Sequence, residues 1–500
     1  MSRQDFDTAV VGAGIGGLGT ASLLARMGRS VILLDRSSGT GGVCQPLVHD
    51  GYRFELGPTL LTGFGPGGPL QLLCQRLGLT LPVKACDPAM QVALPHHRVS
   101  FWAEPERWWR EIRREFPGDE AGWRALWAEL TGLVQARERA LQELPGLPPE
   151  GWGERLRLWR VLTLGTVSPG PAHSGAGGAG LKRALATPFQ ATLNRHRLGE
   201  SSRRALEAAV WYLALRGPGE CSTLEAAMLL HQVRHGTVAV SGGVAALVAA
   251  LTEQFQKDGG QLRLGTPAAG LHLDGGRVRG VITSAGETIR ARWVVANVPP
   301  DVLTGTLLPS RRRWLQGRGV LDGPWEATLT AELMVAALPE ALLPSELSGL
   351  CFVVREPHRP AQEENLVFVR RTPAWEEGQG PGGLRCLSVG RLVRLRDNSE
   401  DAAVETDLLE AVDQLIPGAA GAMACRRTLT PATLAKIWGR PAAAVRYGVK
   451  TPDWLGQRGL PHRLDWPGLL AVGDWTYPGR LVAQVVEGAM RVADLIHTET

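Results

Sequence analysis

A glycine-rich turn between two short apolar runs constrains the fold of this chain most. Residues 6–11 (FDTAVV) are apolar and stop at Gly12, which predicts a buried parallel strand. Residues 15–27 then predict a helix, and residues 30–34 (SVILL) predict a second buried strand that ends at Asp35. A strand, a helix and a strand within about 30 residues form a βαβ unit. The sequence therefore predicts a mixed α/β fold with a Rossmann-like domain at its start.

The turn itself, Gly12, Gly14, Gly16 and Gly17, fits the pattern G-x-G-x-x-G. The first glycine permits a tight turn, the second lets the backbone approach a pyrophosphate, and Gly17 lets the helix pack closely on the sheet. The N-terminus of the following helix presents free N–H groups and a positive dipole end to the phosphates. Asp35 can accept a hydrogen bond from a ribose hydroxyl and disfavours a 2′-phosphate. Together these features predict a dinucleotide site.

Other glycine-rich stretches carry less information. Residues 175–180 match the same pattern but follow Pro, His and Ser instead of a strand, so we interpret them as part of a linker over 164–180. The Gly/Pro-rich residues 378–383 predict a hairpin loop.

Length, charge and cysteine content exclude several classes. A chain of 500 residues predicts two to four domains with a large core. The net charge is 54 − 49 = +5, too small to indicate a nucleic-acid binder. Seven cysteines without a C-x-x-C pair predict a reduced compartment and no metal site. We see no signal-peptide pattern and no apolar stretch of spanning length, so a cytoplasmic location is expected.

The rest of the chain mixes predicted helices and strands. Helices are predicted at 70–79, 203–215, 222–233, 244–257 and 481–497, and strands at 261–264, 267–273, 277–284, 287–291, 293–296 and 468–472. A tight turn is predicted at 274–276, and the last of the strands ends at Gly473-Asp474.

Five motifs follow one another along the chain: Asp35-Arg36, Gly41-Gly42, residues 50–58 (DGYRFELGP), residues 294–297 (VVAN) and residues 473–479 (GDWTYPG). This series resembles the FAD-dependent amine oxidase superfamily, and most of all its phytoene desaturase and carotenoid isomerase branch, which includes carotenoid 3,4-desaturases. The resemblance implies a GR2-type flavoprotein: a Rossmann-like FAD-binding domain interleaved with a substrate-binding domain and a helical lid.

The domain boundaries implied by this resemblance interrupt the cofactor domain twice. We expect FAD-binding segments at 1–95, 216–300 and 461–500, a helical lid that includes a membrane-contact region at 96–215, and a substrate-binding domain at 301–460.

The resemblance also implies which residues contact FAD. They are the pyrophosphate-binding Gly12, Gly14, Gly16 and Gly17; Asp35 and Arg36 at the adenosine ribose; Gly41, Gly42 and Val43 on the flavin side; Gly57, Pro58 and Thr59 near the isoalloxazine; Ala268 at the adenine; Asn297; Gly473 and Asp474 at the ribityl chain; and Leu481 and Val482 at the flavin O2 edge. Val43 stands where relatives often have Arg or Ser, and Asp35 where most have Glu.

The implied activity is desaturation of a carotenoid or related polyene by hydride transfer to flavin, with a quinone or oxygen as electron acceptor. Three alternatives stay open: a carotenoid cis–trans isomerase, a flavin amine oxidase, and a non-catalytic flavoprotein scaffold in a pigment-making assembly. Arg480 stands where amine oxidases place an aromatic side chain, and a cation there would repel a protonated amine.

No catalytic residue is identified from the sequence, and the oligomeric state is left open. Residues to inspect are Tyr447, His231, His235, Glu363 and Glu364. No cysteine stands at a recognisable flavin-linking position, although Cys44 lies near the expected flavin side.

Segment 101–210 is the candidate for peripheral contact with the inner face of the cell membrane. It holds 16 Lys+Arg, 13 Asp+Glu and seven of the 16 tryptophans. Trp favours the headgroup boundary, and basic side chains are attracted to anionic lipid. The alternative is that these tryptophans pack an ordinary helical lid over the substrate channel.

Overall fold

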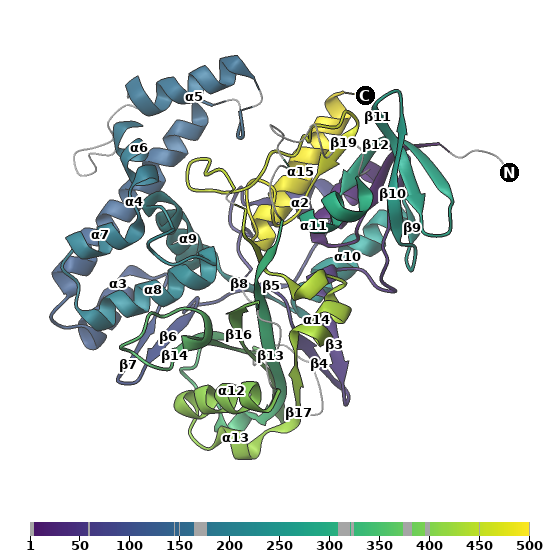
Figure 1. Ribbon diagram of the computed structural model, residues 1–500. Coiled ribbons are helices and arrows are strands. Elements are labelled where there is room, and N and C mark those ends of the chain that lie inside the picture. The colour runs from purple at the N-terminus through teal and green to yellow at the C-terminus, as the bar shows by residue number, and fades with distance from the viewer. Residues whose placement is uncertain are drawn as a thin grey trace.

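Two large sheets and a group of helices make up the molecule (Figure 1). The computed structural model describes residues 5–58, 61–144, 146–149, 151–164, 178–308, 321, 325–373, 383–395, 401–449 and 451–499. The predicted linker at 164–180 and the predicted loop at 378–383 fall mostly outside these ranges, and Thr59 falls outside them.

The first sheet has a parallel centre. Its strands run in the order β19 (Leu469–Ala471), β12 (Thr288–Ala296), β1 (Phe6–Val11), β2 (Val31–Leu34) and β9 (Gln261–Arg263). The strands β1 and β2 are buried almost throughout, as expected of a strand covered on both faces. The predicted βαβ unit is therefore present.

The expectation of two strands at 287–291 and 293–296 was wrong, because β12 is one continuous strand. Its first half alternates between buried and exposed residues and pairs antiparallel with β11 (Arg277–Thr283). Its second half is buried on both faces and pairs with β1 and β19. The change of pattern marks a change of neighbours along the strand, not a break in it. The hairpin is completed by β10 (Ala268–Asp274).

Helices cover one face of this sheet and the hairpin packs toward the other. The helices are α1 (Ile15–Arg26), α2 (Pro69–Leu77), α10 (Gly243–Lys257) and α15 (Val482–Thr498). Alternate side chains of β1 enter different cores, with Val10 in the helical core and Ala9 and Val11 in the core beneath the hairpin.

The second sheet is mostly antiparallel. Its order is β17 (Ala424–Leu429), β13 (Ala327–Pro339), β16 (Leu384–Arg394), β15 (Leu366–Arg371), β14 (Leu350–Val354), β6 (Gln91–Leu94) and β7 (His97–Ser100), and β18 (Arg446–Tyr447) pairs with β13. The strands β6 and β7 join this sheet through β14, so residues 91–100 pack with it although the expected domain boundary at residue 95 divides them.

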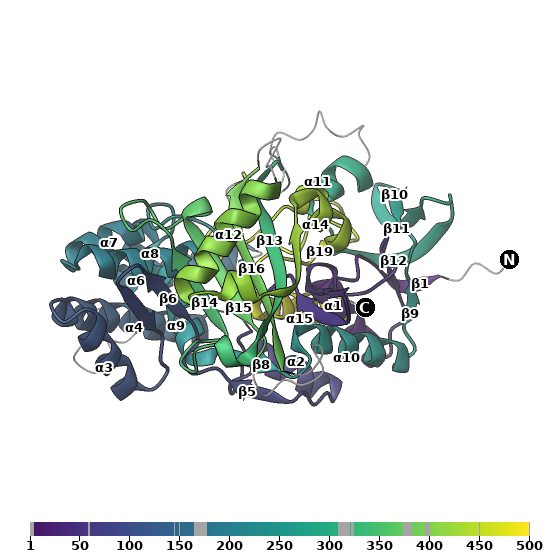
Figure 2. The same cartoon turned by 90° about the horizontal axis from the view of Figure 1, so that it is seen from below.

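The long strand β13 separates two cores. Leu333 and Val335 face the core shared with the helical layer, whereas Met334 and Leu338 face the core beneath α12 (Asp401–Leu415) and α13 (Ala419–Ala422). In Figure 2, α12 lies across the strands of this sheet. The second sheet thus has helices on both faces.

The helical layer lies on the side of the molecule away from both termini (Figure 1). It comprises α3 (Pro105–Glu115), α4 (Glu120–Gln142), α5 (Trp152–Leu164), α6 (Gly178–Ala186), α7 (Phe189–Arg195), α8 (Glu200–Ala214) and α9 (Thr223–Gly236). Trp108 is fully buried at its centre and contacts the rings of Trp123 and Trp127, with centroids 5.6 and 5.2 Å away. Most tryptophans of segment 101–210 therefore form a core.

Short elements connect these layers. They are the 3-10 helix η1 (Gly42–Cys44), β3 (Pro46–His49), β4 (Tyr52–Glu55), β5 (Val83–Ala85), β8 (Val238–Val240), α11 (Pro300–Val302), the π-helix η2 (Leu303–Leu307), η4 (Glu340–Leu342), η5 (Glu363–Asn365), α14 (Pro431–Trp438) and η6 (Pro441–Ala443). Within the described ranges, no helix combines the length and apolar character needed to span a bilayer.

Candidate active site

A cavity of about 510 Å³ opens at the carboxyl ends of β1, β2, β12 and β19. Residues from four distant stretches of the chain line it. Those predicted from the sequence are Gly12, Gly14, Gly16, Asp35, Arg36, Gly41, Gly42, Val43, Pro58, Ala268, Asn297, Gly473, Asp474 and Val482. The structure thus brings most of the expected FAD-binding residues together, and their individual contacts with the cofactor stay predictions.

The glycine turn is shaped to receive a dinucleotide. Gly12 has φ +102°, and a Cβ on Gly14 would lie 2.8 Å from Nδ2 of Asn297, which itself donates to the Gly12 carbonyl at 3.1 Å. The helix α1 begins here without a side-chain cap, so its first N–H groups are left for a ligand. This cradle fits a pyrophosphate.

Gly17 has a packing role and does not line the cavity. A Cβ at this position would lie 2.0 Å from the carbonyl oxygen of Gly12. Any side chain would therefore push α1 away from the turn. Gly57 also has a packing role, because a Cβ at this position would lie 1.8 Å from the Val43 carbonyl oxygen.

Asp35 ties the turn to the segment after β2. Its Oδ2 accepts from the Ala13 N–H at 2.6 Å, and its Oδ1 accepts from the Ser37 N–H at 2.7 Å. Each carboxylate oxygen has a second lone pair, so a ribose hydroxyl can still donate to it. Arg36 instead donates to the carbonyl of Gly439.

Arg440 is the site residue that the sequence reasoning missed. It follows α14 and forms a bidentate pair with Asp474, with Nη2–Oδ1 at 3.0 Å and Nη1–Oδ2 at 2.8 Å. Burial acts to raise the pKa of Asp474, but the Arg440 guanidinium outweighs it and holds that pKa below its ordinary value. No sequence motif marks Arg440. Its partner is 34 residues away on another element, and only the fold joins them.

A smaller apolar pocket of about 150 Å³ adjoins the cofactor cavity on the expected flavin side. Val43, Pro58, Trp438 and Val482 line both spaces. The remaining apolar walls are Leu56, Leu213, Ala331, Leu333, Phe368, Leu392, Val445 and Leu481, with Gly57 and Tyr212. An apolar substrate in this pocket would therefore lie directly beside the cofactor.

Of the catalytic candidates, Tyr447 lines one of the three described cavities. Its hydroxyl donates to Asp301 Oδ1 at 3.2 Å, and burial raises its pKa above the ordinary value, so it stays protonated. His231 and His235 contact each other on α9 and line none of these cavities. The same holds for Glu364 and for Glu363, which binds Arg394 at 2.6 Å.

Cys44 lines the cofactor cavity and is buried. Burial raises the pKa of its thiol to about 12, so the thiolate needed to attack a flavin is absent at neutral pH. We expect acid precipitation of the holoprotein to release all FAD into the supernatant, measured by flavin absorbance. Flavin retained in the pellet of the wild type but not of Cys44→Ala would contradict this expectation.

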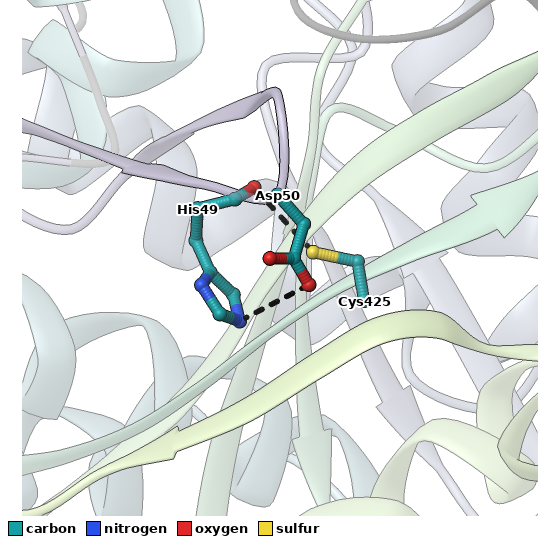
Figure 3. A group of neighbouring side chains, drawn as sticks. All are labelled: His49, Asp50 and Cys425. Carbon is teal, nitrogen blue, oxygen red and sulfur yellow. Dashed lines mark hydrogen bonds and ion pairs between the residues drawn. The ribbon is translucent and has the colours of Figure 1, made fainter.

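Three potential metal ligands lie apart from this site: His49 and Asp50 at the turn between β3 and β4, and Cys425 on β17 (Figure 3). His49 Nε2 is 3.7 Å from Asp50 Oδ2, and the Cys425 thiol donates to the His49 carbonyl at 3.5 Å. Burial, together with the nearby Asp50 carboxylate, raises the pKa of Cys425. These contacts join the turn to β17, and a protonated thiol is a poor metal ligand.

Comparison with known proteins defines the class. Residues 15–318 match the family described as flavin containing amine oxidoreductase, so the chain belongs to this family. It is an FAD-dependent oxidoreductase with a Rossmann-like FAD domain, which confirms the predicted fold class, cofactor and superfamily.

The chain is 24% identical to a neurosporene-forming phytoene desaturase of Cereibacter sphaeroides, over 98% of this chain and 95% of that protein. It is 23% identical to the chloroplastic prolycopene isomerase of Arabidopsis thaliana, over 97% and 82%. A zeta-carotene-forming phytoene desaturase of Myxococcus xanthus is 29% identical over 59% of this chain and about half (54%) of its own length. These relatives confirm the predicted carotenoid branch of the family.

Solved structures share the fold. An oxidoreductase from Methanosarcina mazei superposes with a TM-score of 0.63 at 16% identity, over 97% of this chain and 99% of that one. A putrescine oxidase variant superposes with the same score at 15% identity, over 99% of both chains.

Proposed function

We propose that this enzyme desaturates a carbon–carbon bond of a carotenoid or related polyene. The observation that carries the proposal is the apolar pocket that shares walls with the cofactor cavity. Leu333, Phe368 and the ring of Trp438 offer a polyene dispersion contacts. Relatives aligned over nearly the whole chain are named for desaturation or isomerisation of carotenoids.

Desaturation removes a hydride and a proton from neighbouring substrate carbons. When bound, FAD supplies the hydride acceptor, and a quinone or oxygen is the proposed terminal oxidant. The chain's own part is to hold the polyene flat against the cofactor and to exclude water, which the aromatic and aliphatic walls accomplish. The Arg440–Asp474 pair fixes the loop between the cofactor cavity and this pocket.

Expression in a host that makes coloured polyene precursors tests the proposal. We expect a red-shifted absorption spectrum and a product that has lost pairs of hydrogens, measured by chromatography with mass detection. A product of unchanged mass and altered retention would replace desaturation by isomerisation. Peroxide release by the purified enzyme with simple amines would overturn the polyene assignment.

We further propose peripheral attachment to the inner face of the cell membrane through α5. Trp152, Leu156 and Trp159 are 86%, 57% and 54% exposed and recur at helical spacing, so they share one face. Arg155 and Arg160 are exposed beside them, which favours an anionic lipid surface as the partner. In Figure 1, α5 lies at the outer end of the helical layer.

The other tryptophans of segment 101–210 support the alternative interpretation, in which tryptophans pack a helical lid. Trp108, Trp123 and Trp127 are buried, and Trp102 and Trp109 are half-buried against the same core. The proposed membrane contact is therefore confined to α5.

We expect Trp152→Ala/Trp159→Ala/Arg160→Glu to lose most of its co-sedimentation with anionic vesicles. The variant removes two interfacial rings and reverses one charge that attracts anionic lipid. Val48→Ala/Leu342→Ala, which trims apolar side chains exposed elsewhere, is the matched control and should sediment as the wild type. FAD content reports folding in each case. Equal sedimentation of the three proteins would exclude α5 as the contact.

A further inference from the structure

Arg480 is a partly buried cation at the junction of three cavities. It lines the cofactor cavity, the apolar pocket and a third cavity of about 550 Å³. Its Nη1 atom is buried and has no hydrogen-bond partner, and among the described residues no carboxylate forms an ion pair with the guanidinium. Burial lowers the pKa of Arg480 to about 10, so the side chain is still charged at neutral pH.

The third cavity, which we call the polar chamber, carries the polar side chains of Arg216, Glu220, Glu225, Arg446, Tyr447, Gln457, Arg458, Asp474, Arg480 and Gln484, beside apolar side chains that include Leu215, Leu229, Trp325 and Trp475. The charged part of this wall does not suit a hydrocarbon. Desolvating these charged and amide groups against an apolar chain would leave their hydrogen bonds unmade.

The other arginines of the polar chamber already have carboxylate partners. Arg458 Nε donates to Glu225 Oε2 at 3.0 Å, and Arg216 also binds Glu225. Arg446 Nη2 donates to Glu220 Oε2 at 3.3 Å.

Asp474, the remaining carboxylate of the chamber wall, is paired with Arg440 outside it. Counted over the described wall residues, four arginines face three carboxylates, and Asp474, the carboxylate whose charge acts on Arg480, is already paired with Arg440 outside the wall. A cation that is partly removed from water and has no carboxylate of its own in ion-pair contact is stabilised when a ligand brings an anion.

The polar chamber and the apolar pocket adjoin at Arg480. Leu213, Val445, Asp474 and Arg480 line both spaces. A molecule with an apolar chain and one anionic end can therefore place the chain in the pocket and the end group in the chamber, with Arg480 between them.

On this basis we propose that the polar chamber binds a carboxylate at one end of the polyene substrate, and that Arg480 is the residue that recognises it. The inference rests on the proposed function and narrows its substrate class from any carotenoid or related polyene to a polyene acid. The planar guanidinium can donate two parallel hydrogen bonds to a carboxylate, which fixes the end group and so the position of the chain beside the cofactor.

The test measures binding of matched probes to the FAD-loaded protein without turnover. The probes are a polyene acid and a hydrocarbon polyene with the same number of conjugated double bonds, and their Kd values are determined from the shift of polyene absorption in detergent micelles. We expect the wild type to bind the acid at least about 10-fold more tightly, as one charge-assisted hydrogen bond implies.

Arg480→Gln should weaken binding of the acid about 10-fold or more and leave binding of the hydrocarbon within about twofold. Arg480→Lys should keep part of the preference, because it keeps the charge and loses the fork geometry. Arg263→Gln, which breaks an exposed ion pair with Glu287 outside the three cavities, is the control and should match the wild type.

Equal affinity of the wild type for acid and hydrocarbon would overturn the inference. Equal weakening of the binding of both probes by Arg480→Gln would also overturn it, since Arg480 would then act as part of the pocket wall. Loss of FAD from that variant would overturn it as well, since the cofactor would then be the partner of Arg480. The outcome is separable from that of the proposed function. Desaturation of a hydrocarbon polyene without an Arg480-dependent preference refutes this inference alone, whereas an Arg480-dependent preference without any desaturation refutes the activity and leaves the acid-binding site standing.

Discussion

Gly14→Val is expected to fold and to purify without FAD. The new Cβ would lie 2.8 Å from Nδ2 of Asn297, and the rest of the valine side chain would occupy the space where the backbone meets the pyrophosphate. The loss should be essentially complete, because the valine would fill the space that the pyrophosphate needs. The ratio of flavin to protein absorbance measures occupancy, and far-UV circular dichroism reports folding.

A glycine in open surroundings provides the control for this substitution. Nothing lies within 4 Å of a Cβ built on Gly118, and its backbone angle does not require glycine, so Gly118→Ala should retain full FAD occupancy. A folded Gly14→Val protein that still carries stoichiometric FAD would show that the pyrophosphate lies elsewhere.

Asp474→Ala is expected to lower both the stability of the protein and its affinity for FAD. The substitution leaves the buried Arg440 guanidinium unpaired, which should cost about 3 kcal/mol of folding free energy. It also removes the predicted acceptor for the ribityl hydroxyls, worth about 1.5–3 kcal/mol of binding. Thermal unfolding of the apoprotein isolates the first effect, and FAD titration measures the second.

The exposed pair Arg76–Asp494 supplies the comparison. Its atoms are a similar 2.9 Å apart, but both side chains are more than 40% exposed, so Asp494→Ala should change stability by less than about 1 kcal/mol. If Arg440→Met/Asp474→Ala is as unstable as Asp474→Ala alone, the unpaired cation is not the cause of the loss.

The Arg440–Asp474 pair makes the free energy of unfolding depend on pH. The folded-state pKa of Asp474 is below its ordinary value, so its contribution is complete at neutral pH and is lost as the pH falls through the folded-state pKa. The difference in free energy of unfolding between the wild type and Asp474→Ala should therefore become smaller as the pH is lowered.

The cofactor half of the fold could be predicted because its signals are local. Each strand of the βαβ unit is a short apolar run, and the glycines of the turn form a recognisable pattern, so residues 6–35 predict the unit by themselves. The atoms that exclude a Cβ at Gly14 nevertheless belong to the distant Asn297. The sequence pattern predicts two strands where the structure has the single strand β12. The reason is that its change of burial pattern comes from pairing with strands distant in the sequence.

The features that could not be predicted from the sequence depend on which distant parts of the chain come into contact in the fold. Arg440 resembles any other arginine until the fold places it against Asp474. Trp108 and Trp152 have similar sequence surroundings, yet the first is fully buried and the second is 86% exposed, because one faces the centre of the helical layer and the other its outer end. The polar chamber was not anticipated, because residues from several distant loops form it.

The cofactor cavity is completed by residues far along the chain from those that begin it. The strand β19 and the helix α15 span Leu469–Ala471 and Val482–Thr498, and they bring Asp474 and Val482 to a cavity begun by Gly12. During synthesis, the chain must therefore extend past α15 before this cavity can close around FAD. The helices of the helical layer, which all precede β8, are made well before that point.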